Sequence, residues 1–171
     1  MNKFSIINTE TSDLNFIYYL FDEAILYQKK KGYPVWPDYD KDVLNNDIAS
    51  KQQFKIILED QIACIFSICY SDPIVWRERD NGDAIYLHRI VVNPAYKGQH
   101  LFGVILEWVI ESIAGKDLQF VRMDTWDKNP DLTNYYKLYG FEIIEHFKTP
   151  DSEDLPIQQR NNEVVLMELR I

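Results

Sequence analysis

The hydrophobic period of this chain changes near residue 53, and that change limits the folds that the chain can adopt. Before it, residues 11–31 carry apolar side chains at spacings of three and four, which predicts a helix. After it, residues 53–60 and 61–71 show a period of two, which predicts a pair of adjacent strands. A helix followed by neighbouring strands indicates a mixed α/β domain.

The rest of the chain alternates between strands and helices. Further strands are predicted at residues 3–8, 84–92, 118–126, 141–147 and 163–171, and further helices at residues 41–50, 101–114 and 129–140. Residues 73–83 are predicted to form a turn-rich connection and residues 148–161 a polar loop. We therefore predict one domain over residues 1–171, of class α/β (α+β), in which helices flank a mixed, mostly antiparallel sheet.

The charge of the chain bears on its partners. The chain has 27 acidic and 18 basic residues, so no nucleic acid is expected, because a phosphate backbone requires a basic surface. The acidity either favours a cationic small substrate or serves solubility alone. No apolar run approaches the roughly 20 residues of a membrane span, and the N-terminus lacks a signal-peptide pattern. We predict a cytoplasmic protein without a membrane partner, in which Cys64 and Cys69 remain reduced because they point to opposite faces of one strand.

A predicted strand-to-helix junction lies in the segment VVNPAYKGQHLFGVILEW, from Val91 to Trp108. The turn at its centre holds Gly98, with Lys97 and His100 close by. Free amide groups at the start of a helix, together with the helix dipole, suit a diphosphate. The segment is neither a Walker A loop nor a dinucleotide fingerprint, and on its own it fits a structural turn as well as a phosphate cradle.

A second segment, MDTWDKNPDLTNYYKLYGF, predicts a helix rich in tyrosine. Helical spacing places Tyr135, Tyr136 and Tyr139 near one another. The pattern indicates either aromatic packing against the core or a tyrosine hydroxyl that reaches a cleft as a proton donor.

Together the two segments resemble the GNAT superfamily of acetyl-CoA-dependent N-acyltransferases. In that family a strand ending in Val-x-Pro leads into an Arg/Gln-x-x-Gly-x-Gly/Ala loop, and Asn-x-x-Ala-x-x-Leu-Tyr-x-x-x-Gly-Phe follows. Here LHRIVVNPAYKGQHLFGVILEWV precedes NPDLTNYYKLYGF, in which Asn129, Tyr136 and Gly140-Phe141 stand at the family spacing. The resemblance covers residues 80–147, and the N-terminal half is similar in the order of its elements and in a Trp-containing loop, GYPVWPDY.

The loop departs from the family pattern at three positions. Lys97 stands where Arg or Gln is usual, and His100 and Phe102 stand where two small residues are usual. The family binds the diphosphate largely through backbone amides, which survive a side-chain change if the backbone tolerates a Cβ. A histidine with positive φ is strained, and Phe102 is bulky enough to narrow the groove. We expect either a shifted loop, with Gly103 in a small-residue role, or weaker acyl-CoA binding.

The resemblance implies direct transfer of an acetyl group from acetyl-CoA, bound as the acyl donor, to an amine. It implies that Tyr136 is the general acid beside the sulfur, whereas Tyr135 is a core residue. Asn129 is expected either to bind CoA or to cap its helix. The other residues implied in CoA binding lie on the strand edge and the loop: Ile90, Val91, Val92, Lys97, Gly98, Gln99, His100, Leu101, Phe102, Gly103 and Val104.

The general base has fewer candidates. Some family members carry a carboxylate on the strand before the loop, but residues 84–92 contain none. His88 titrates near neutrality and is the side-chain candidate there, the alternative being a hydrogen-bonded structural histidine. A water chain to Asp124 or Glu59 is a second route. Acceptor contacts are predicted for Trp36, Tyr39, Trp76 and Asp124, although the aromatic side chains among these also suit a cap over the core.

These patterns predict an N-acetyltransferase without a metal site, acting on the amine of a small molecule or peptide, with a homodimer as a further expectation from the family. An alternative is a GNAT-fold protein that binds acyl-CoA or a partner without catalysis, because the loop departs from the family motif. A third is an α/β domain unrelated to CoA.

Overall fold

The fold is that of a computed structural model, which describes residues 4–171. Lys3, at the start of the predicted first strand, lies outside the described residues. The helices and strands are β1 (Ser5–Asn8), α1 (Leu14–Lys31), α2 (Lys41–Ala49), β2 (Gln53–Leu58), β3 (Gln61–Cys69), α3 (Pro73–Trp76), β4 (Ala84–Val92), α4 (Leu101–Ser112), β5 (Phe120–Trp126), α5 (Pro130–Lys137), β6 (Glu142–Lys148) and β7 (Glu163–Arg170). Short 3-10 turns are η1 (Thr11–Asp13), η2 (Arg77–Arg79), η3 (Pro94–Tyr96) and η4 (Ile157–Gln159).

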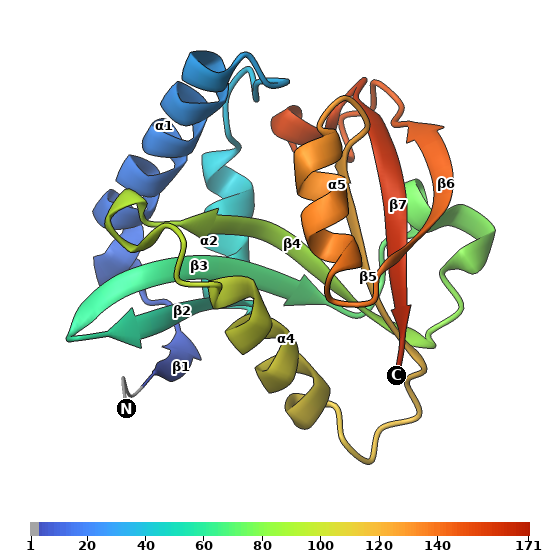
Figure 1. Ribbon diagram of the computed structural model, residues 1–171, viewed down its shortest axis with the longest axis horizontal. Helices are drawn as coiled ribbons and strands as arrows, with labels where there is room; N and C mark the ends of the chain where they lie inside the picture. The colour runs from blue at the N-terminus through green and yellow to red at the C-terminus, as the bar shows by residue number, and fades with distance from the viewer. Residues whose placement is uncertain (1–3) are drawn as a thin grey trace.

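The strands form one mixed sheet in the order β1-β2-β3-β4-β5-β7-β6 (Figure 1). All neighbours in this sheet run antiparallel except β4 and β5, which are parallel and are joined by a crossover through α4. The predicted fold class is therefore confirmed. The structure differs from the prediction at residues 73–83, where Pro73 at the first helical position begins α3 and η2 follows it.

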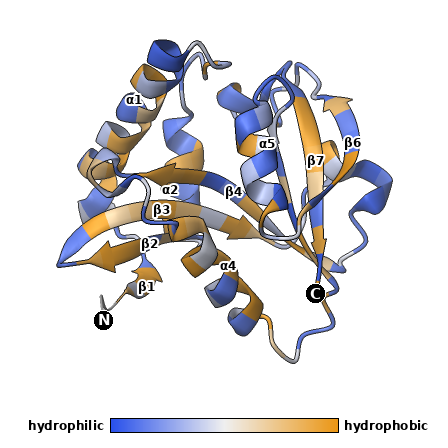
Figure 2. Ribbon diagram, viewed as in Figure 1, coloured by the Kyte–Doolittle hydropathy of each residue, from blue (hydrophilic) through white to orange (hydrophobic). Residues whose placement is uncertain are grey.

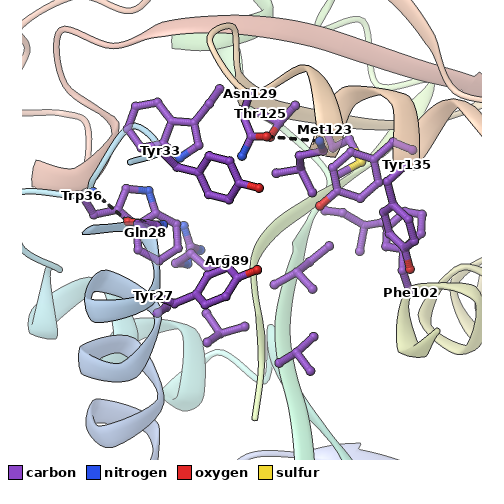
Figure 3. A pocket seen from close by; sticks show the side chains of 18 of the residues that line it. Tyr27, Gln28, Tyr33, Trp36, Arg89, Phe102, Met123, Thr125, Asn129 and Tyr135 are labelled. Atoms are coloured by element: carbon purple, nitrogen blue, oxygen red, sulfur yellow. Dashed lines mark hydrogen bonds between the residues drawn. The ribbon is translucent and has the colours of Figure 1, made fainter. Parts of the chain in front are cut away.

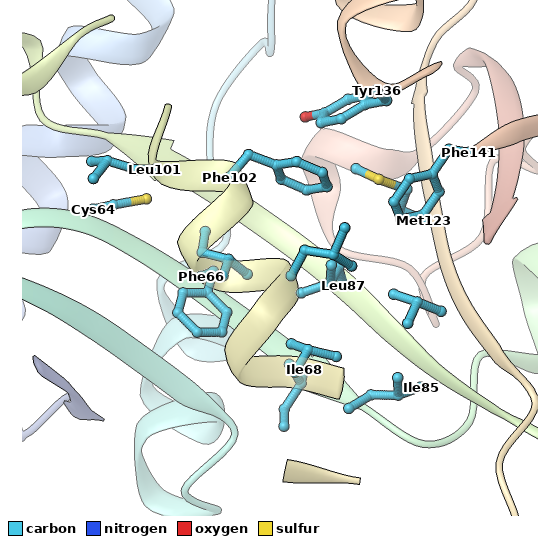
Figure 4. Packing of buried hydrophobic residues seen from close by; sticks show 14 of the residues in the cluster. Cys64, Phe66, Ile68, Ile85, Leu87, Leu101, Phe102, Met123, Tyr136 and Phe141 are labelled. Carbon is cyan, nitrogen blue, oxygen red and sulfur yellow. The ribbon is translucent and has the colours of Figure 1, made fainter. Parts of the chain in front are cut away.

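Helices cover both faces of the sheet. The helices α4 and α5 pack on one face with strand residues such as Phe66 and Leu87 (Figure 4), and α1 and α2 pack on the other with Ile65 and Val91. The opposite placement of Ile65 and Phe66 follows from the alternation of side chains along a strand. Figure 2 shows β2 as largely hydrophobic, whereas α1 and α5 mix hydrophobic and hydrophilic turns, as expected for helices that cover a sheet on one side only.

A β-bulge in β4 changes which of its side chains face each helical layer. The register against β3 shifts between Ile65 and Ser67, and Arg89 has a φ of 51°. Before the bulge, Leu87 packs towards α4 and α5, and after it Ile90 packs there instead. Bulges commonly redirect side chains next to functional sites, and this one gives Arg89 a direction that regular alternation would not.

The sequence also leads to expectations for the two cysteines and for membrane-spanning segments. Cys64 is buried and Cys69 is partly exposed, and both are free thiols within the described part of the chain. No helix among residues 4–171 has the length and apolar character needed to cross a membrane.

Candidate active site

A cleft opens where β4 and β5 separate. Their pairing extends only from Ala84 opposite Phe120 to Tyr86 opposite Arg122. Beyond it lies a cavity of about 600 Å³ bordered by α1, β4, the loop before α4, β5, α5 and η4 (Figure 3). This volume is typical of small-molecule sites. Because α1 and α5 lie on opposite faces of the sheet, the cleft joins the two faces.

The loop before α4 presents free backbone amides to this cleft. Gly98 and His100 both have positive φ, of 81° and 53°. In residues 97–103, the amides of Lys97, Gln99 and Gly103 donate to nearby carbonyls, whereas those of Gly98 and His100 have no acceptor among the residues that the structure describes. His100 is thus in the left-handed conformation expected from its glycine-like position, and a loop of this kind with the helix start behind it suits an anion.

Lys97 adds positive charge to the loop. Its Nζ lies 3.2 Å from the centroid of the Tyr27 ring on α1. Partial burial lowers the pKa of Lys97, and the charge of Lys31 lowers it further. Lys97, with Lys31 close enough to affect its pKa, gives this end of the cleft positive charge that suits a diphosphate, although the chain as a whole is acidic.

Phe102 and Gly103 have structural roles. Phe102 is buried, and its ring centroid lies 4.8 Å from that of Tyr136 (Figure 4). The Phe102 centroid lies 5.0 Å from that of Tyr139. A Cβ on Gly103 would lie 3.2 Å from Cε1 of Tyr139, so this glycine allows α4 and α5 to approach. Gly103 and Val104 do not line the cleft. Both lie within α4, whose start packs against α5, so the structure gives no support to their predicted contact with a diphosphate.

Two tyrosines of α5 reach the cleft, but their hydroxyls differ. The Tyr135 hydroxyl is hydrogen-bonded to that of Tyr139 at 3.2 Å. The Tyr136 hydroxyl has no hydrogen-bond partner within residues 4–171, and burial raises its pKa, so it stays protonated near neutrality. Asn129 also lines the cleft, and its Oδ1 accepts from the Leu132 amide at 3.2 Å, which confirms the helix-cap interpretation.

His88 lies between two carboxylates. Its Nε2 is 3.4 Å from Oδ2 of Asp72, and its Nδ1 is 3.9 Å from Oδ1 of Asp124. Burial lowers the pKa of His88 to about 3 and raises those of Asp72 and Asp124 to about 7 and about 6. Near neutrality His88 is therefore neutral, and the carboxylates are the groups that exchange protons. His88 and Asp124 line the cleft, and Asp72 stands behind them.

Arg89 also lines the cleft and is anchored from α2. Its Nε and Nη2 donate to Oδ2 of Asp47 at 2.9 and 2.6 Å, and the same oxygen accepts from Ser67 Oγ at 2.7 Å. This buried ion pair fixes the guanidinium beside His88.

The fold brings only some of the predicted acceptor-binding residues to the cleft. Trp36 borders the cleft, with its amide bonded to Gln28 Oε1 at 3.0 Å (Figure 3). Tyr39 and Trp76 do not border the cleft, which contradicts their predicted contact with the acceptor. Tyr39 is buried under α1 and packs on Phe21, whereas Trp76 is turned fully inward by α3, a helix that the sequence did not indicate.

The cleft is also lined by residues of the strand edge and of the loop, whose contact with CoA stays a prediction: Ile90, Val91, Val92, Lys97, Gly98, Gln99, His100, Leu101 and Phe102. Several lining residues were missed, among them Tyr27, Tyr33, Arg89 and Gln158. No local motif marks these residues, since they come from α1, the loop after it, the bulge and η4.

Comparisons with known proteins agree with this geometry. The chain matches the acetyltransferase (GNAT) family over residues 19–141. A curated relative, the uncharacterized N-acetyltransferase YesJ of Bacillus subtilis, is 27% identical over 73 residues, which cover 43% of this chain and only 41% of that protein. A solved GNAT-family acetyltransferase from Listeria monocytogenes is 20% identical, with 98% of this chain and 95% of that chain covered and a TM-score of 0.77.

A second solved structure, of mutant forms of the spermidine/spermine N-acetyltransferase SpeG from Vibrio cholerae, is 16% identical, with 98% and 93% of the two chains covered and a TM-score of 0.62. At such identities the solved structures establish a shared fold. The family match spans most of the chain and includes the loop before α4 and the helix that carries Tyr136. The chain therefore belongs to the acetyltransferase (GNAT) family.

Proposed function

We propose that the protein is an N-acetyltransferase that transfers an acetyl group from acetyl-CoA to the amine of a small molecule or peptide. The observation that carries the proposal is the cleft through the sheet, which has a proton donor at one face and proton acceptors at the other. Tyr136 belongs to the face covered by α4 and α5, as does Met123. Asp124 follows Met123 on β5 and therefore points to the opposite face, where it lies close to His88.

The residues present fit acetyl-CoA. The free amides of Gly98 and His100, with Lys97 beside them, suit its diphosphate. From Leu87 to Val92, β4 has no β5 partner, so its edge suits the amide groups of an extended pantetheine arm, in the manner of an added strand. When bound, acetyl-CoA supplies an acetyl group activated as a thioester.

The acceptor must lose a proton, because a lysine-like ammonium has a pKa near 10.4 and its nitrogen has no free electron pair. We assign proton acceptance to Asp124, with His88 as its neutral neighbour. A base works best with a pKa near the working pH, and the pKa of Asp124 is about 6 whereas that of His88 is about 3. His88 on its own is therefore the weaker candidate.

Tyr136 is the proton donor in this proposal. As the amine nitrogen forms its bond to the acetyl carbon, the carbon–sulfur bond breaks and the sulfur takes the phenol proton. Asp124 holds the proton that the amine has lost. The raised pKa of Tyr136 keeps its phenol protonated, and the hydroxyl has no competing hydrogen-bond partner within residues 4–171.

Calorimetry with acetyl-CoA and CoA, followed by an assay of thiol release with an amine panel, tests the proposal. Binding followed by amine-dependent release of CoA supports it. Binding without release favours a GNAT-fold protein that holds acyl-CoA without catalysis, the alternative that His100 and Phe102 at usually small positions suggest. Absence of binding contradicts both.

A further inference from the structure

One side of the cleft holds a buried donor that the acetyl transfer does not use. Gln158, in η4, lines the cleft and is only 2% exposed. Its Oε1 accepts from the Asp40 amide at 3.1 Å, which fixes the orientation of the side chain. Its Nε2 is buried and has no partner among the described residues. A buried donor without a partner is costly, so this N–H group is suited to an acceptor atom of a ligand.

Arg89 provides a second donor on the same cleft. Its bonds to Asp47 use Nε and Nη2 and leave Nη1 for another partner. The bulge and the ion pair together hold the guanidinium in place, so binding an anion there requires little ordering of the side chain. A guanidinium of this kind binds a carboxylate well, because both groups are planar and carry opposite charge.

Charges of both signs therefore meet where the acceptor amine must react. Arg89 follows His88 directly, and its charge partly offsets the effect of burial on the pKa of Asp124. Other acidic residues at the cleft are already engaged or lie near a cation. Tyr33 donates to Asp131 at 3.4 Å, and Glu23 lies close enough to Lys97 to raise its pKa. A molecule with one positive and one negative group matches this pattern better than a polyamine does.

We propose that the acceptor is an amino carboxylate, such as a free amino acid, whose carboxylate binds Arg89 and Gln158 while its amine faces Asp124. The inference rests on the proposed acetyl transfer and names its substrate class. Trp36 and Tyr33 line the same cleft and offer apolar surface to the rest of the acceptor. Figure 3 shows both aromatic side chains on the α1 side of the cleft, opposite Phe102 and Tyr135.

The test compares matched acceptors with the wild-type protein. Phenylalanine is paired with phenylethylamine, lysine with cadaverine, and spermidine is added as a polyamine; thiol release gives kcat/KM for each. We expect at least one amino acid to exceed its decarboxylated partner by about 100-fold or more, because sites built to hydrogen-bond a group reject analogues that lack it. Equal or faster turnover of the decarboxylated amines, or of spermidine, overturns the inference but leaves the acetyltransferase function intact. If acetyl-CoA binds and no amine reacts, the proposed function itself fails, and the inference fails with it.

A variant of Gln158 tests whether this residue determines the preference for an acceptor with a carboxylate. Gln158→Glu retains the Oε1 acceptor for Asp40 and replaces the free donor by a negative charge. We expect KM for the amino acid to rise by about tenfold or more, with little change for the decarboxylated partner. Asn161→Asp is the matched control, since it adds the same charge to the same loop at an exposed position away from the cleft. Equal losses for both acceptors in Gln158→Glu would indicate a structural role only.

Discussion

The variant Tyr136→Phe removes the proposed proton donor but keeps the packing of the ring. In Tyr136→Phe the ring keeps its contact with Phe102, whose centroid lies 4.8 Å away, and no described residue loses a hydrogen-bond partner. The free energy of unfolding should therefore change by less than about 0.5 kcal/mol. General acid catalysis contributes about 10²- to 10⁴-fold. We expect kcat to fall by at least about 100-fold, or about 2.7 kcal/mol of transition-state stabilisation.

The assay is thiol release at saturating acetyl-CoA across the pH range, with chemical denaturation as the check on folding. KM for acetyl-CoA should change by no more than about threefold, because the proposed diphosphate site is the loop before α4 and not α5. Tyr135→Phe is the matched control; its hydroxyl bonds Tyr139, so turnover should stay within about threefold of wild type. Full turnover in Tyr136→Phe at every pH refutes the assignment.

Further predictions concern stability and pH. Phe102→Ala should destabilise the protein by about 3–5 kcal/mol in chemical denaturation, because it empties a buried aromatic site between α4 and α5; a loss below about 1 kcal/mol would contradict that packing. Gly98→Ala should cost about 1 kcal/mol from strain at a φ of 81° alone, since no atom lies within 4 Å of the added Cβ; an unchanged midpoint in the same denaturation series would show that the loop has another conformation. Acetyl transfer should fall as the pH decreases through about 6, because Asp124 then takes up a proton; a pH profile of kcat/KM that is flat from pH 5 to pH 8 rules out this base. Because the pKa of Asp72 is raised, the folded protein binds more protons than the unfolded chain between about pH 4 and pH 7, and its stability falls as the pH rises through this range. Asp72→Asn should therefore raise the thermal midpoint relative to wild type more at pH 8 than at pH 5. An equal difference at both pH values would contradict this.

The elements with a strong period were predictable from the sequence, and the short ones were not. The helix at residues 14–31 and the strands at 53–58 and 61–69 bury faces that their spacing reveals. By contrast, α3 has only four residues and no period to detect, and it turns Trp76 into the core. A tryptophan in a Pro- and Gly-flanked segment resembles a loop residue until tertiary packing decides its place.

The site was predictable where one segment carries it. The loop and the tyrosine helix are each continuous in sequence, so the family resemblance could indicate a glycine-like position for His100 and a place at the cleft for Tyr136. Spacing alone left both open. Asp72 and Gln158 come from turns far away in the chain, and only the sheet topology brings them towards His88 and the cleft. The bulge at Arg89 breaks the strand period, so the direction of the Arg89 side chain could not be predicted from the alternation of residues along the strand.

The most direct test of the acetyltransferase function is mass spectrometry of the products. The wild-type protein is incubated with acetyl-CoA and single amines, and the acetylated amine and free CoA are quantified together. We expect equal amounts of the two products, formed only when both substrates are present and lost in Tyr136→Phe. Intact acetyl-CoA after prolonged incubation with every amine, at concentrations where calorimetry shows it bound, would contradict the account.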